Sequence, residues 1–233
     1  MKYCKFEDGC KKFHSGTCPL ANNGAISDCL KLYIIEKLKD EALLTEEQRK
    51  PVAMRLDSSK VDKEAFDRLK VIENNIEKFV QGGNNLYICS KITGNGKTSF
   101  SLKLLIAYLE RIWYKSGASC RGLFINVPSF FFAMKENFDK KLEVVEHIKK
   151  NILSADLIVW DDIATKGLTT FETELLLSYI SNRISAGKSN IYTSNTIGQD
   201  LRDCVGERLY SRIWNSSEII VFNGVDKRGV SFS

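Results

Sequence analysis

Residues Asn85–Phe100 read NLYICSKITGNGKTSF, and this stretch decides the fold of the chain around it. The apolar run Leu86–Cys89 predicts a buried strand, the glycines that follow predict a tight turn, and apolar residues with helical spacing begin at Phe100. A strand, a glycine turn, Gly-Lys-Thr and a helix in this order predict a phosphate-binding loop. Backbone N–H groups of such a loop surround the phosphate oxygens, and the dipole of the following helix attracts the same anion.

The loop assigns a role to each of its polar residues. Lys97 would reach the β- and γ-phosphates of ATP, and the Thr98 hydroxyl would ligate Mg²⁺. The residues expected to bind the nucleotide are Thr93, Gly94, Asn95, Gly96, Lys97, Thr98 and Ser99. The first glycine of the full phosphate-loop pattern falls at position 91, which is Lys91. The alternative is a glycine-rich turn before a helix that binds no nucleotide.

A second apolar run, Ala155–Trp160, ends on two acidic residues. A buried parallel strand would deliver Asp161 and Asp162 to the edge of the sheet where the phosphate loop lies. Asp161 would hold Mg²⁺ through water, and Asp162 would orient or deprotonate the attacking water. The alternative is a strand that ends on two solvated acids.

Two further polar positions are candidates for the same chemistry. The predicted strand Asn190–Ser194 ends at Asn195, which could hold the lytic water or sense the γ-phosphate, although an Asx turn is nearly as plausible. Arg208 and Arg212 fall four residues apart on one face of a predicted helix. Arginines commonly stabilise transferring phosphoryl charge from a neighbouring subunit, and the alternative here is ordinary surface charge.

The remaining pattern predicts a small N-terminal region, a linker and one large α/β domain. Ser27 would cap a helix that begins at Asp28, and the polar stretch Glu46–Ser59 would be a linker. One helix over Val61–Val80, ended by two glycines, would lead into the phosphate-loop strand. Further expected helices are 97–113, 129–138, 144–152 and 171–186, and further strands are 122–127 and 217–222. The domain limits are 1–50 for the N-terminal region, 51–60 for the linker and 61–233 for the ATPase domain.

The N-terminal region is rich in potential metal ligands. Cys4, Cys10, His14 and Cys18 have a spacing that can close a tetrahedral zinc site around a short loop, and Cys29 is a rival fourth ligand. The C-x5-C-x3-H part matches the last three ligands of CCCH zinc fingers. In a reducing compartment such clustering suggests metal rather than disulfides. The alternative is a set of unrelated free cysteines.

Composition limits the location and partners of the chain. No apolar run is long enough to span a membrane, and the first residues lack the apolar core of a signal peptide, so we expect a cytoplasmic protein. A net charge of +5 permits a nucleic-acid partner. Lys135 and Phe138 are candidates for contact with single-stranded DNA, because aromatic faces stack on bases and basic groups follow phosphates. The alternative is that the phenylalanines of this segment belong to the core.

Residues 60–230 resemble an AAA+ ATPase, and in particular the bacterial replicative-helicase loaders of the DnaC/DnaI type. The resemblance is carried by GNGKTS, LIVWDD, IYTSN, GERLYSRI, VFNGVDKR and AMKENF. It implies a parallel sheet flanked by helices, without a C-terminal helical lid. It also implies that Asn195 takes the sensor-1 place, Arg212 the arginine-finger place and Arg228 a sensor-2-like place. Lys91 and Asp162 depart from the pattern of the family, where glycine and glutamate are usual.

The resemblance implies a function as well. The N-terminal region of the loaders binds the hexameric DnaB-type helicase, and some members bind zinc there. We therefore expect an ATP-dependent helicase loader, of a size that suggests a phage-encoded one, that self-associates through ATP-bridged interfaces and acts on single-stranded DNA. One alternative is a transposition-helper ATPase of the IstB type. Another is a module with weak hydrolysis that binds and inhibits host helicase machinery.

Overall fold

A five-stranded parallel sheet forms the centre of the protein. The computed structural model describes residues 15, 26–50, 61–136, 142–164 and 167–224. The strand order across the sheet is β2-β3-β4-β1-β5. The strands are β1 (Asn85–Cys89), β2 (Gly122–Asn126), β3 (Leu157–Asp161), β4 (Ser189–Ser194) and β5 (Ser217–Val221). Because all pairs are parallel, the carboxyl ends of the strands lie along one edge of the sheet.

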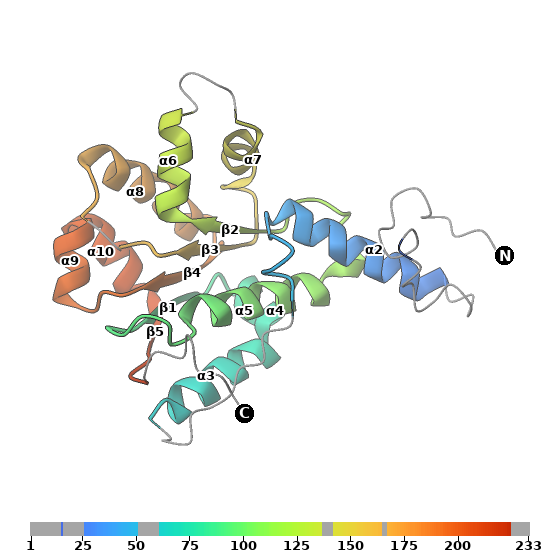
Figure 1. The fold of residues 1–233 in the computed structure, drawn as a ribbon, viewed down its shortest axis with the longest axis horizontal. Coiled ribbons are helices and arrows are strands. Elements are labelled where there is room, and N and C mark those ends of the chain that lie inside the picture. The colour runs from blue at the N-terminus through green and yellow to red at the C-terminus, as the bar shows by residue number, and fades with distance from the viewer. Residues whose placement is uncertain (1–14, 16–25, 51–60, 137–141, 165–166, 225–233) are drawn as a thin grey trace.

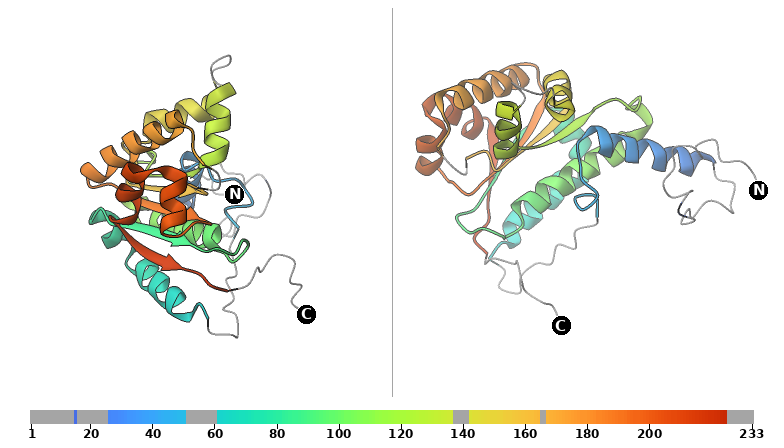
Figure 2. Two further views of the ribbon diagram at one scale, coloured as in Figure 1. Left: turned by 90° about the vertical axis from the view of Figure 1, so that its left-hand side faces the viewer. Right: turned by 45° about the horizontal axis from the view of Figure 1, so that its top comes forward.

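Helices cover both faces of this sheet (Figures 1 and 2). The helices associated with one face are α2 (Ile26–Glu41), α3 (Lys63–Asn74), α4 (Ile76–Gln81), α5 (Lys97–Arg111) and the short 3-10 helix η2 (Trp113–Lys115). Those on the other face are α6 (Val127–Glu136), α7 (Glu143–Asn151), α8 (Thr170–Ser185), α9 (Gln199–Val205) and α10 (Glu207–Trp214). The result is a three-layer α/β structure in which both faces of the sheet are buried.

Each face of the sheet has its own hydrophobic core, and alternate residues of a strand belong to the two cores in turn. In β1, Leu86 and Ile88 face the core under α5, while Tyr87 and Cys89 face the core under α8 and α10. The whole of β1 is buried, which explains why its sequence is a continuous apolar run rather than an alternating one. In β3, likewise, Val159 belongs to the core under α5 and Trp160 to the core under α8 and α10.

The expected helices over 97–113, 129–138, 144–152 and 171–186 are present with limits shifted by one or two residues, and two other expectations are wrong. The helix expected over Val61–Val80 is two helices, α3 and α4, separated at Asn75. The Asn75 side chain donates a hydrogen bond to the Val71 carbonyl at 3.0 Å, and such local bonds compete with continuous helix. The helix expected from Asp28 begins at Ile26, so Ser27 lies inside the first turn and the predicted cap is wrong.

The carboxyl end of α2 packs on the α/β core. Leu38, Ala42 and Leu44 belong to the same buried cluster as α5, and the Phe124 N–H of β2 donates to the Ala42 carbonyl at 3.0 Å. The expected linker 51–60 lies outside the described residues, and the proposed domain limits stay a prediction. Within the described ranges, no helix is both long and apolar enough to cross a membrane.

Candidate nucleotide site

The loop between β1 and α5 has the backbone shape that the sequence predicts. Gly94 and Gly96 have positive φ values of 71° and 99°, a region that residues with a Cβ rarely adopt. A Cβ added at Gly96 would meet nothing within 4 Å, so glycine is required there by conformation rather than by space. The buried side chain of Asn95 donates to the Ser90 hydroxyl, which also accepts the Ile92 N–H at 3.0 Å. These hydrogen bonds within the loop stabilise its conformation.

Lys97 is the first residue of α5, and its side chain folds back over the loop. The Lys97 ammonium donates to the Ile92 carbonyl at 3.2 Å and to Asn95 Oδ1 at 3.4 Å. Only 6% of the residue is exposed. A buried ammonium at the amino end of a helix, beside a glycine turn, suits a bound phosphate.

Lys91 lies away from this arrangement. Its ammonium is 3.6 Å from the Asp200 carboxylate of α9, and both side chains are largely exposed. Lys91 is not among the residues with positive φ, so its backbone conformation does not require glycine. Loss of the first glycine of the pattern therefore leaves the loop backbone compatible with a phosphate site.

Thr98 and Asp161, the two expected magnesium ligands, are in direct contact. The Thr98 hydroxyl donates to Asp161 Oδ1 at 2.8 Å, and the aspartate is 4% exposed. A hydroxyl oxygen and a carboxylate oxygen are the hard ligands that Mg²⁺ prefers. The residues present therefore fit a magnesium ion bound between the phosphate loop and the end of β3.

Two residues that the sequence analysis did not single out complete the Asp161 environment. Thr193 of β4 donates its hydroxyl to Asp161 Oδ1 at 2.7 Å, and Asn126 of β2 donates its amide to Asp161 Oδ2 at 3.3 Å. The register explains both contacts, because Asn126 is paired with Asp161 and Thr193 follows the residue paired with Trp160. The signal in the sequence was a polar residue at the end of each neighbouring apolar strand.

Asp162 has an unusual backbone and an altered acidity. Its φ is 56°, and its N–H donates to the Thr193 hydroxyl at 3.0 Å. Burial raises the pKa of Asp162, the neighbouring Asp161 carboxylate raises it further, and Lys97 opposes both effects. A carboxylate with a raised pKa is a stronger base, as the expected role in activating water requires.

Asn195 lies at the same edge of the sheet, directly after β4. Ser194 pairs with Cys89, the last residue of β1, so Asn195 lies beyond the point where the phosphate loop begins. Its Oδ1 atom is buried and has no hydrogen-bond partner among the described residues. Buried polar atoms without a partner are uncommon and often mark a place for water or a ligand.

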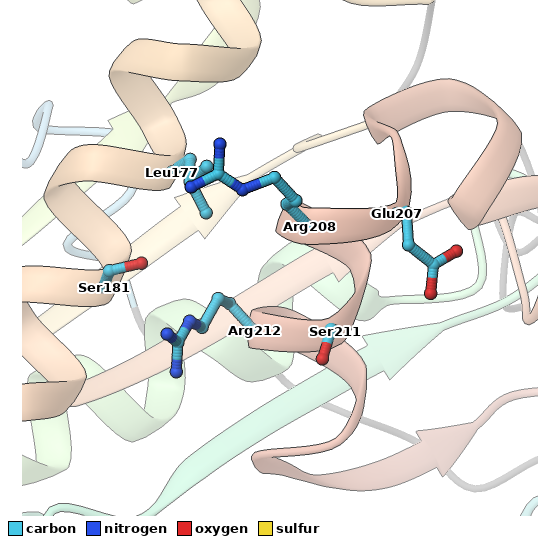
Figure 3. A pocket seen from close by; sticks show the side chains of 6 residues that line it. All are labelled: Leu177, Ser181, Glu207, Arg208, Ser211 and Arg212. Atoms are coloured by element: carbon cyan, nitrogen blue, oxygen red, sulfur yellow. The ribbon is translucent and has the colours of Figure 1, made fainter.

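Arg208 and Arg212 are not brought to this site within the chain. No hydrogen bond or ion pair between described residues joins either arginine to Lys97, Asp161 or Asp162. Both side chains are exposed on α10 and extend toward α8 (Figure 3). They border a surface groove of about 450 Å³ that is lined by Leu177, Ser181, Glu207, Arg208, Ser211 and Arg212.

The expected DNA contacts are described only in part. Lys135 of α6 is exposed, and its ammonium is 3.3 Å from the Glu172 carboxylate at the start of α8. Phe130 and Phe131 are buried in the core, as the alternative interpretation expected, whereas Phe132 is 65% exposed. Phe171, next to Glu172, is 56% exposed, and the sequence analysis singled out neither exposed ring for DNA contact.

Several expected site residues lie outside the described part of the chain. These are Cys4, Cys10, His14, Cys18, Phe138 and Arg228. Cys29 belongs to α2, but its side chain likewise lies outside the described part. The expected N-terminal zinc site and the sensor-2-like arginine therefore stay predictions.

The sheet order, the glycine loop after β1 and the acidic pair after β3 belong to a fold that solved structures share. Solved structures give the comparison. The DnaC helicase loader matches with a TM-score of 0.59 and 21% identity, over 76% of this chain and 99% of that chain. DnaI matches with a TM-score of 0.59 and 18% identity, over 82% and 100%. AMPPCP-bound DnaA from Aquifex aeolicus matches with a TM-score of 0.54 and 21% identity, over 72% and 48%.

The sequence matches no protein-family model and no curated protein at a significant level. At these identities the solved structures establish the fold. The parallel sheet flanked by helices that the sequence predicts is confirmed.

Proposed function

We propose that this protein is an ATP-dependent loader that binds a replicative DnaB-type hexameric helicase and deposits it on single-stranded DNA. The observation that carries the proposal is the contact between Thr98 and Asp161, which fits a magnesium-nucleotide site, in a chain with the fold of DnaC and DnaI. DnaC is itself a helicase loader. The DnaA neighbour contains AMPPCP, an ATP analogue, which supports ATP as the ligand.

Each residue of the site has a proposed role in hydrolysis. Thr98 and Asp161 would hold Mg²⁺, which supplies charge neutralisation for the phosphates, and Lys97 would contact the β- and γ-phosphates. Asp162 would accept a proton from the attacking water, and Asn195 would orient that water through its unpartnered Oδ1. Asp162 has a positive φ directly after a buried strand, which is a strained backbone conformation. Residues strained in this way cluster at active sites.

Arg212 would act on the nucleotide of a neighbouring subunit. Both α10 arginines are exposed and neither reaches the loop of its own chain, which supports a role between subunits. Bound ATP would then join protomers, because the γ-phosphate of one subunit and Arg212 of the next would meet at the interface. Arg228 would contact the nucleotide of its own subunit.

The remaining assignments concern partners. Residues 1–50 would bind the helicase, with Cys4, Cys10, His14 and Cys18 around zinc and Cys29 as the alternative ligand. Lys135 and Phe138 would contact single-stranded DNA in the cytoplasm. The exposed ring of Phe132, one helical turn before Lys135, would add a stacking surface on the same side of α6.

Turnover in solution tests the enzymatic part. Lys97→Ala should abolish ATP hydrolysis, whereas Lys103→Ala, which removes a half-buried lysine of the same helix that is paired with Glu73, should leave it within about twofold. Arg212→Ala should lower turnover about tenfold or more while nucleotide affinity is retained. Arg208→Ala is the matched control, because it removes the same charge from the same helix, and it should have a much smaller effect on turnover. Equal residual turnover in wild type and Lys97→Ala would favour a binding module without hydrolysis.

Light scattering after size exclusion tests the loader part. The protein and its cognate replicative helicase would be mixed with ATP, with ADP and without nucleotide. A discrete complex that requires residues 1–50 and changes with nucleotide supports the proposal. Absence of a complex in every nucleotide state would shift the assignment to a transposition-helper ATPase.

A further inference from the structure

Three potential metal ligands from separate elements meet at the edge of the sheet that carries β2. Glu41 is the last residue of α2, Cys120 precedes β2, and His147 lies in α7. One ligand atom from each residue can be chosen so that all lie within 4.8 Å of one another, and all three residues are half-buried. No other group of this kind occurs in the part of the chain that the structure describes.

The contacts inside the cluster bring the three side chains toward one point. The His147 Nε2 atom is 2.8 Å from the Glu41 backbone carbonyl and 3.8 Å from the Glu41 carboxylate. The Cys120 thiol donates to the same carbonyl at 3.5 Å and to the Gly122 carbonyl at 3.4 Å. The imidazole and the thiol therefore share one acceptor, with a carboxylate beside them.

We propose that Glu41, Cys120 and His147 bind a divalent transition metal of the zinc class. A thiolate, an imidazole and a carboxylate form a typical mixed ligand set for Zn²⁺, and a water molecule would take the fourth position. Tetrahedral zinc geometry places ligand atoms about 3.3–3.6 Å apart. The His147 and Glu41 side-chain atoms, 3.8 Å apart, therefore need to approach by only about half an ångström, and rotation of the flexible Glu41 side chain can supply this movement.

Metal binding would replace protons that now make hydrogen bonds. Burial, followed by the Glu41 carboxylate, raises the pKa of the Cys120 thiol to about 12, so the metal must displace the thiol proton. At His147 the metal would occupy the Nε2 lone pair in place of the Nε2–H contact with the Glu41 carbonyl. Affinity should therefore rise with pH.

The position of the cluster gives the metal a structural role. Ala42, next to Glu41, accepts the Phe124 N–H of the edge strand β2, and Leu43 then turns the chain with a φ of 61°. A metal bound here would fix the end of α2 and the middle of α7 to the sheet. This role is independent of the loader proposal and of the expected zinc site at Cys4–Cys18.

Metal analysis of full-length variants separates the two zinc sites. In one variant the cysteines before residue 30 are replaced by serine, which leaves the Glu41–Cys120–His147 cluster intact. After dialysis against a weak chelator this variant should retain about one zinc per chain by elemental analysis. Adding Cys120→Ser and His147→Gln should remove that zinc. Cys204→Ser, a half-buried cysteine outside the cluster, is the matched control and should change nothing.

The same two substitutions in the otherwise unchanged protein keep the proposal testable if the serine variant fails to fold. Zinc content should then fall by about one per chain relative to wild type. Cobalt substitution supplies a ligand-specific signal. The thiolate–cobalt charge-transfer band should weaken with Cys120→Ser, because only the thiolates of the N-terminal site would remain, and should be unchanged with Cys204→Ser. A well-folded serine variant without zinc, or a zinc content unaffected by Cys120→Ser and His147→Gln, would overturn the proposal.

Discussion

Thr193→Val isolates a residue whose importance is visible only in the structure. The fully buried Thr193 hydroxyl donates to Asp161 Oδ1 at 2.7 Å and accepts the Asp162 N–H at 3.0 Å. Valine has nearly the same shape and the same β-branch, so the strand and its packing are retained. The substitution therefore removes two hydrogen bonds and leaves the two acidic residues without their shared partner.

The decrease in the free energy of unfolding can be estimated from these contacts. A hydrogen bond to a carboxylate contributes about 1.5–3 kcal/mol and a neutral one about 1 kcal/mol, while the extra buried methyl group returns about 0.8 kcal/mol. The free energy of unfolding should therefore fall by about 2–3 kcal/mol. With a urea dependence of about 2–3 kcal/mol per M, the unfolding midpoint should decrease by about 1 M at constant slope. Magnesium affinity should fall about 10-fold, as when groups that orient a metal ligand are removed.

Urea denaturation and the magnesium dependence of single-turnover ATP hydrolysis provide the measurements. Thr173→Val, on the half-buried side of α8, is the matched control, because the Thr173 side chain makes no hydrogen bond to another described residue. It should shift neither quantity appreciably. A Thr193→Val protein with the wild-type midpoint and the wild-type magnesium dependence would refute the role of this hydroxyl.

Three further substitutions test separate contacts. Asp162→Asn should abolish turnover yet stabilise the protein at pH 7, because the raised pKa of Asp162 means that ionisation of this carboxyl group opposes folding. The increase in the urea midpoint should disappear as the pH falls through the raised pKa toward 3.8, where Asp162 is protonated in both the folded and the unfolded protein. Lys91→Gly should change ATP affinity in calorimetry by less than about threefold, and stability by less than about 1 kcal/mol, since its ion pair is exposed. Asp62→Ala should cost about 2–3 kcal/mol in urea denaturation, because the buried carboxylate accepts the Asn223 and Gly224 N–H groups at 2.7 and 3.0 Å; exposed Asp67→Ala is the control.

The strands were predictable because this sheet is buried on both faces. Each observed strand lies within one or two residues of its predicted limits, since a parallel strand between two helical layers is a short apolar run with polar ends. The break between α3 and α4 was not predictable from periodicity. Apolar residues continue on both sides of Asn75 at helical spacing, so periodicity alone predicts one helix, and only the Asn75 side chain, which competes for the Val71 carbonyl, favours an end there.

The candidate site was predictable where its residues lie within one motif. Lys97 and Thr98 follow from the glycine turn, and Asp161 follows from the end of an apolar strand. The contributions of Asn126 and Thr193 depend on strand order and register, which the sequence does not specify. The Glu41–Cys120–His147 cluster is harder still to predict, because 106 residues separate Glu41 from His147 and no local spacing connects them.

The charge arrangement at the candidate nucleotide site suggests why assembly and hydrolysis would be coupled. Asp161 and Asp162 place two carboxyl groups beside the loop, and Lys97 is the cation that hydrogen-bonds to the loop among the described residues. A nucleotide adds further negative charge, so magnesium alone leaves the developing charge on the γ-phosphate only partly balanced. Arg212 carries positive charge on an exposed helix of the same chain without reaching its own loop. If a second protomer presents this arginine, the balance is completed only when subunits meet, and turnover per subunit should rise with protein concentration.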